Sequence, residues 1–145
     1  MYSGPGAEYG SSARIKAIAV HPTKPNRVMA GMGNAIGYQP VTLTSSFNGG
    51  VTWADTRLSD YGEVRAILFN PLLDGQILLG GATGISGGGP VIWRSLDDGA
   101  TWAEVFSGTA NYGMAVSALA MNDVSPTLIY AGSGSVYGRD NSGPV

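Results

Sequence analysis

The chain contains no cysteine and a single histidine, His21. The absence of thiols excludes a disulfide framework and a thiolate metal site, and one imidazole excludes any site that needs two. Charged residues make up only 12% of the 145 residues, the net charge is −2, and no basic run is present that could follow a phosphate backbone. The sequence therefore predicts no metal, no cofactor and no nucleic-acid partner.

Long apolar runs are also missing. No window reaches the roughly 18 apolar residues that a membrane-spanning helix needs. Residues 1–13 are polar and glycine-rich, without the basic start and apolar stretch of a signal peptide. We therefore expect no membrane span, and the signal of an exported form would have been removed or would lie outside this chain.

What the chain has in excess is glycine, with 23 residues, accompanied by 8 prolines. These residues favour many short strands joined by tight turns over long helices. Hydrophobic residues make up 43% of the chain, which is enough to build a core. The composition predicts an all-β fold.

An internal repeat runs through most of the chain. Residues 15–22 align with residues 64–71 after a shift of 49 positions, and the alignment continues without a gap to Trp53 on Trp102. A further shift of 52 positions aligns residues 116–122 with the second copy. Repeats of 20 to 50 residues are typical of architectures in which one β or α unit recurs.

Each copy has the pattern of a series of short strands. The first strand is expected to end at a turn-forming pair, which is His21-Pro22, Asn70-Pro71 or Asn122-Asp123. The second strand is expected to end in glycine, at Gly31, Gly80 or Gly132. A third strand is expected over residues 41–45 and 91–94 in the first two copies.

A shared motif follows the third strand in the first two copies, with the spacing Ser-x-Asp-x-Gly-x-Thr-Trp. Its members are Ser46, Asn48, Gly50, Thr52 and Trp53, and then Ser95, Asp97, Gly99, Thr101 and Trp102. This spacing resembles the Asp-box, or BNR repeat, of a β-propeller family. That family includes sialidases, xyloglucan-cleaving glycoside hydrolases, the sortilin luminal domain and photosystem assembly factors.

The chemistry of the motif suits a turn between two strands. Asp97 can accept hydrogen bonds from backbone N–H groups, and Thr101 can tie the turn to its neighbour. Gly50 and Gly99 can adopt the positive φ that such a turn needs. Asn48 replaces the usual carboxylate in the first box, but its amide oxygen can accept the same bonds. We expect both boxes to be structural and the tryptophans to begin the fourth strand.

The resemblance implies an all-β fold of four-stranded antiparallel propeller blades. The expected boundaries are about 13–58 for the first blade, 59–108 for the second and 109–145 for the third. The third blade is incomplete, because residues 136–144 lack the Thr-Trp half of a box. Closed propellers have about four to eight blades. We therefore expect partners that supply further blades, either in a longer chain or in identical copies.

Two acids are weak catalytic candidates. Asp60 and Glu63 lie close together in the link that enters the second copy. They are candidates because glycoside hydrolysis commonly uses two carboxylates, one on either side of the bond that is cleaved. Solvated carboxylates in a turn are the competing explanation. Four aromatic residues lie outside the repeat positions and are candidates for stacking on a ligand or partner, namely Tyr38, Tyr61, Trp93 and Tyr112.

Without a catalytic constellation, the sequence favours a non-enzymatic binding or scaffold module that presents a rigid surface to a protein or a glycan. The alternative is a fragment of an extracytoplasmic glycoside hydrolase, similar to xyloglucanases, with acids that lie partly in other blades. The resemblance points to an extracellular or cell-envelope location in either case.

Overall fold

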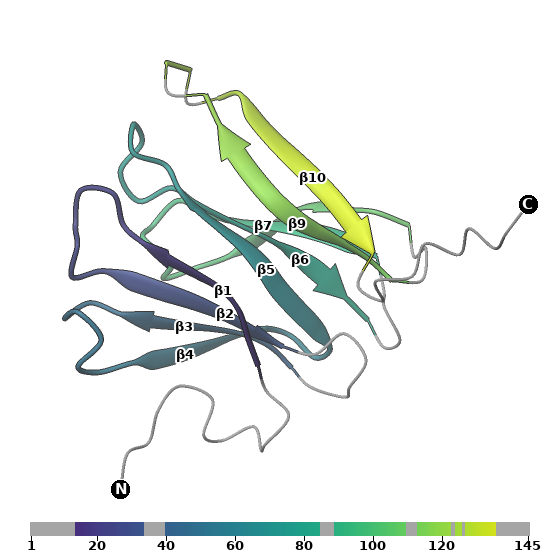
Figure 1. Ribbon diagram of the computed structural model, residues 1–145, viewed down its shortest axis with the longest axis horizontal. Helices are drawn as coiled ribbons and strands as arrows, with labels where there is room; N and C mark the ends of the chain where they lie inside the picture. Colours follow the sequence, from purple (N-terminus) through teal and green to yellow (C-terminus); the bar gives the residue numbers. More distant parts are fainter. Residues whose placement is uncertain are drawn as a thin grey trace, which may run out of the picture.

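The computed structural model describes residues 14–33, 40–84, 89–109, 113–122, 124–125 and 127–135 (Figure 1). These residues form ten β-strands and no helix, which confirms the prediction of an all-β fold. The first four strands are β1 (Arg14–Val20), β2 (Val28–Gly33), β3 (Val41–Ser46) and β4 (Ala54–Ser59). They are followed by β5 (Gly62–Phe69), β6 (Ile77–Thr83), β7 (Pro90–Ser95), β8 (Ala103–Ser107), β9 (Met114–Met121) and β10 (Ile129–Ser135).

The strands pair antiparallel in chain order. Strands β1 to β4 form one four-stranded meander and β5 to β8 form a second, here called the first and second units. A single residue pair, Gly33 with Glu63, joins the two units into one curled eight-stranded sheet. Strands β9 and β10 form a separate hairpin, the third unit, with β9 packed against β5 and β6.

The strand register repeats from unit to unit. Ala17 pairs with Gly31, and the corresponding pairs in the other units are Ala66 with Gly80 and Ala118 with Gly132. The register of each unit also shifts by one residue just before that alanine, at Lys16, Arg65 and Ser117. A bulge at the same place in three copies shows that the sequence repeat is also a repeat of backbone geometry.

The hydrophobic core lies between the first and second units. The first unit contributes Met29, Val41 and Leu43, and the second contributes Val64, Phe69, Ile77, Leu79, Val91 and Trp93. Because both units bury an apolar face against each other, neither is expected to be stable as an isolated sheet.

Two strand boundaries differ from the sequence prediction. The second strands do not end at the expected glycines, because β2, β6 and β10 continue for two or more residues beyond Gly31, Gly80 and Gly132. At Gly31 a Cβ atom would lie 2.5 Å from Cγ1 of Val64, so this glycine permits close packing between units. The fourth strands begin at Ala54 and Ala103, one residue after the tryptophans that were expected to start them.

Candidate functional site

The first box is a closed network of hydrogen bonds in the turn between β3 and β4. The Ser46 hydroxyl accepts a bond from the Gly50 amide at 2.8 Å and donates to Oδ1 of Asn48 at 3.0 Å. Oδ1 of Asn48 also accepts from the Thr52 amide at 2.9 Å, while its Nδ2 donates to the Thr52 hydroxyl at 2.8 Å. The Trp53 indole N–H donates to the Gly50 carbonyl at 3.0 Å.

The second box has the same network between β7 and β8. Asp97 accepts bonds from the Thr101 amide at 2.8 Å, the Thr101 hydroxyl at 2.5 Å and the Ser95 hydroxyl at 2.8 Å. These donors, with Thr101 the largest contributor, lower the pKa of Asp97 to about 2. Gly99 has a φ of 86°, and its carbonyl accepts from the Trp102 indole N–H at 3.1 Å.

The hydrogen bonds expected of Asn48 and Asp97 are therefore present in both turns. The threonine bond reverses direction between the boxes, since Asn48 donates to Thr52 whereas Asp97 accepts from Thr101. The side-chain hydrogen bonds of the motif residues stay within their own turns, whereas the amides of Gly49 and Asp98 donate to the carbonyls of Asn26 and Gly75. The structural role of the boxes remains a prediction.

His21 makes the turn after β1. Its Nδ1 accepts bonds from the amides of Thr23 and Lys24, each at 3.2 Å. Burial is the main cause of the lowered pKa of His21, and the nearby charges of Lys24 and Arg27 add to it. The side-chain oxygens of the repeat counterparts accept from two amides each, Asn70 from Leu72 and Leu73, and Asn122 from Val124 and Ser125.

Several ion pairs connect the two units, and in one of them the cation is buried. The buried guanidinium of Arg27, in the loop between β1 and β2, contacts both the carboxylate and the backbone carbonyl of Asp98 in the second box. The same guanidinium lies over the rings of Phe47 and Phe69, at 5.0 and 5.9 Å from their centroids. The sequence does not reveal the pair of Arg27 and Asp98, because it joins non-equivalent positions of two repeats and no residue spacing marks it.

The two acids proposed as catalytic candidates have different surroundings. Asp60 is exposed and pairs with Arg57 at 2.8 Å. Glu63 is buried on β5, where it contacts Nε of Arg65 and lies 3.7 Å from Nζ of Lys16. The suggestion of a solvated turn carboxylate is therefore wrong for Glu63, because the residue belongs to a strand and two cations compensate its buried charge.

The aromatic candidates also differ in their positions. Trp93 is 4% exposed and belongs to the core between the units, so most of its surface is used in packing. Tyr61 lies in the short link between β4 and β5, where its backbone carbonyl accepts a bond from the Gly84 amide at 3.0 Å. Tyr38 and Tyr112 lie outside the described residues.

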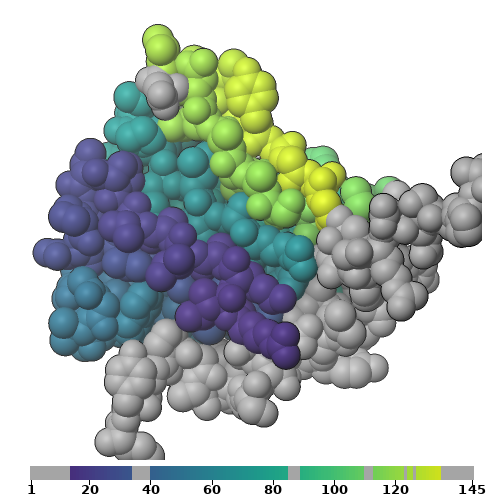
Figure 2. Space-filling view, in the orientation of Figure 1, coloured from purple at the N-terminus to yellow at the C-terminus, as the bar shows by residue number. Residues whose placement is uncertain are grey.

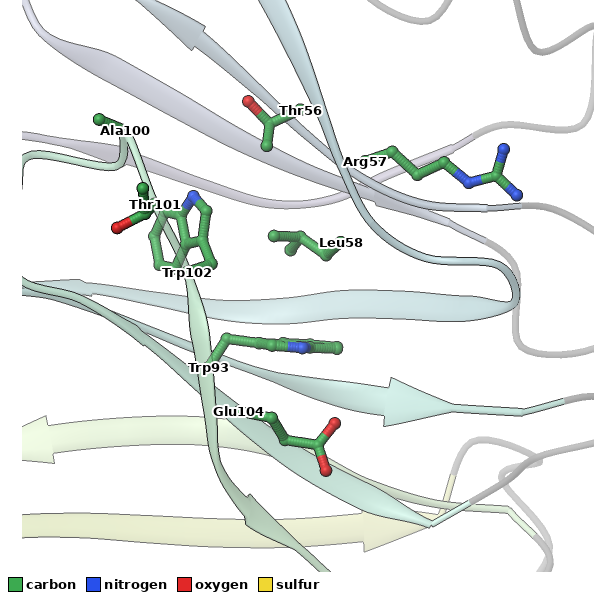
Figure 3. Close-up of a pocket in the computed structure, with 8 residues that line it drawn as sticks. All are labelled: Thr56, Arg57, Leu58, Trp93, Ala100, Thr101, Trp102 and Glu104. Carbon is green, nitrogen blue, oxygen red and sulfur yellow. The ribbon is translucent and has the colours of Figure 1, made fainter.

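A groove of about 310 Å³ lies between β4 of the first unit and the outer strands of the second. Its lining residues are Thr56, Arg57, Leu58, Trp93, Ala100, Thr101, Trp102 and Glu104. Figure 3 shows Leu58 and the two tryptophan side chains in the middle of this group, whereas the guanidinium of Arg57 extends away from them and pairs with Asp60. The groove thus combines an apolar base with hydrogen-bonding groups from two units.

No protein-family model matches this chain, and no curated protein matches it either. The described residues contain no group of three acidic, histidine or cysteine side chains that could hold a metal ion. In the same part of the chain, no helix is long and apolar enough to cross a membrane.

Proposed function

We propose that this chain is part of an Asp-box β-propeller and acts as a non-enzymatic module that binds a glycan in the groove between the first and second units. Three features support the propeller. Each of the first two units is a four-stranded meander, each carries its box between the third and fourth strands, and β5 packs against both β1 and β9. In this proposal each unit is one blade and the third blade is incomplete.

The groove carries the functional part of the proposal. Sugar rings present apolar C–H faces that stack on aromatic rings, together with hydroxyls that bond to polar side chains. Trp102 uses its indole N–H on Gly99, so it offers the groove an apolar ring surface. Thr56 and Glu104 supply a donor and acceptors around that surface.

Binding is favoured over hydrolysis because the groove holds a single carboxylate. Glu104 is the one acid among the residues that line it, whereas retaining and inverting glycosidases commonly use two. Asp60 pairs with Arg57, and Glu63 is buried against Arg65 and Lys16, so neither is a free partner acid. This arrangement argues against the alternative of a glycoside hydrolase within the described residues.

Tryptophan fluorescence tests the proposal directly, because two indoles line the groove. Titration with xyloglucan oligosaccharides, cello-oligosaccharides and sialyllactose is expected to change the emission for at least one ligand, with no hydrolysis products on chromatography. Glu104→Gln should weaken that binding about tenfold, or ~1.4 kcal/mol. The matched control is Asp55→Asn, because Asp55 occupies the equivalent position on β4 and does not line the groove.

Three results would contradict the proposal. A flat titration with every glycan would remove the evidence for binding. Equal losses of glycan affinity in Glu104→Gln and Asp55→Asn would show that the binding site is not the groove. If the wild-type protein cleaved an oligosaccharide and Glu104→Gln did not, the groove would be a catalytic site.

A further inference from the structure

The first strand of the second unit places one row of apolar side chains against the first unit. In the second unit this row is Val64, Ile67 and Phe69, all packed in or against the core shared with the first unit. The repeat alignment makes Ile15, Ile18 and Val20 the corresponding row of β1. We call these three residues the β1 row.

The partner of each row is a glycine on the second strand of the preceding unit. A Cβ atom at Gly31 would lie 2.5 Å from Cγ1 of Val64, and one at Gly80 would lie 2.6 Å from Cγ1 of Val116. Such distances are too short for any side chain, so the valine methyl groups occupy the space that glycine leaves open. The same contact is thus built twice, between the first and second units and between the second and third.

Among the described residues, both ends of this series lack such a contact. Ile15, Ile18 and Val20 are 54%, 67% and 56% exposed, although their counterparts in the second unit pack on the core. On the third unit, the one described side chain that a Cβ atom at Gly132 would meet is Ala118, at an ordinary contact distance of 3.6 Å. Tyr130 is 57% exposed, whereas its counterparts Met29 and Leu78 are 1% and 4% exposed. Large exposed apolar side chains grouped in this way mark an interaction surface.

We propose that the β1 row of one chain packs onto the face formed by Gly132, Tyr130 and Ala120 of a second copy of the same chain, which we call the receiving face. A single chain carries both halves of a contact that it already makes twice internally, so a second copy supplies a matching surface. Figure 2 shows β1 and β10 at the surface, with residues of the second unit between them. The contact is head-to-tail, because the two surfaces differ.

This surface is separate from the groove of Figure 3, so the two proposals are tested independently. Light scattering coupled to size exclusion measures molar mass over a concentration series. The mass of the wild-type protein is expected to rise with concentration from 14.9 kDa toward twice that value or a higher multiple. Ile18→Glu should hold the protein at the monomer mass by placing a charge in the β1 row.

Gly132→Val, on the receiving face, is also expected to hold the protein at the monomer mass. Its side chain would fill the space reserved for Ile15, while the open surroundings of Gly132 allow the variant to fold. Tyr130→Glu gives a second test of the receiving face, and circular dichroism checks that each variant keeps its strands. Val51→Glu is the matched control, because Val51 is 81% exposed in the first box turn, away from both surfaces.

The decisive step mixes the two monomeric variants. The Ile18→Glu chain keeps an intact receiving face and the Gly132→Val chain keeps an intact β1 row, so an equimolar mixture should form a one-to-one complex of twice the monomer mass. A mixture that stays monomeric would overturn the head-to-tail contact. A wild-type mass that stays at 14.9 kDa at every concentration would overturn the second copy as partner and favour further repeats of a longer chain.

Discussion

At the scale of single residues, the turn after the first strand accepts either histidine or asparagine, because both offer an unprotonated acceptor to the next two amides. His21 fills this role through Nδ1, and Asn70 fills it through Oδ1. The difference between them is that histidine titrates near neutral pH and asparagine does not.

His21 should therefore give the fold a pH dependence that asparagine removes. Its pKa is lowered from 6.5 in the folded chain, so its contribution to stability is present above pH 6.5 and is lost as the pH falls below that value. We expect the wild-type melting temperature to decrease as the pH falls below 6.5. The melting temperature of His21→Asn should depend less on pH over the same range. Equal slopes for the two proteins would show that His21 stays unprotonated or does not contribute.

Asp97 should act in a lower pH window. Its pKa is lowered from 3.8 to about 2, so its contribution is present above pH 3.8 and is lost as the pH falls toward 2. Asp97→Asn, which copies Asn48, should keep the melting temperature at neutral pH and reduce the acid loss. Asp97→Ala should lower the neutral melting temperature but leave binding by the folded fraction intact. A stable Asp97→Ala protein without binding would mean that the box is functional rather than structural.

At the scale of strands, the glycines of β2, β6 and β10 have equivalent sequence positions but different surroundings. Gly80 is packed against Val116, and Gly132 is open. Gly80 and Gly132 do not have a positive φ, so an alanine at either position causes no backbone strain. The pair therefore isolates the effect of packing between units.

Gly80→Ala is expected to destabilise the chain by about 1 to 3 kcal/mol, because the added methyl group overpacks the contact with Val116. Gly132→Ala should leave the stability unchanged or raise it by about 0.5 to 1 kcal/mol, since alanine suits a strand better than glycine. Urea unfolding monitored by circular dichroism measures both. Similar losses of stability in the two variants would show that these glycines are needed for the strand itself and not for the contact between units.

Much at this scale follows from the sequence. The turns at His21 and Asn70 and the box turns were predictable because each depends on a side chain bonding to backbone a few residues away. The glycine positions were misjudged as strand ends. Their role comes from a valine more than thirty residues away, and local composition gives no sign of such an approach.

At the scale of the whole molecule, the arrangement of the units depends on contacts that break the repeat. Arg27 corresponds to Gln76 and Leu128 in the other copies, and Asp98 corresponds to Gly49. The groove likewise takes Arg57 from one unit and Trp102 from the next. Alignment of the copies predicts equivalent strands, but it carries no information on pairs made by non-equivalent positions.

Arg27→Met tests this ion pair, because it keeps an apolar stem near Phe47 and Phe69 but removes the charge that faces Asp98. We expect a loss of about 1.5 to 3 kcal/mol in the free energy of unfolding, as for hydrogen bonds to charged groups. Lys24→Met is the matched control, because the Lys24 pair with Asp74 is exposed and should contribute little. Equal effects of the two substitutions would mean that the burial of Arg27 adds nothing.

The repeated contact between a glycine and the first-strand valine of the next unit underlies both the fold and the proposed assembly. Nuclear Overhauser spectroscopy of the methyl-labelled protein measures it directly. Strong cross-peaks are expected from the Val64 methyl groups to the Gly31 α-protons and from those of Val116 to the Gly80 α-protons. Their absence in a protein that retains its strands would show that the units do not pack in this way and would contradict the repeat architecture.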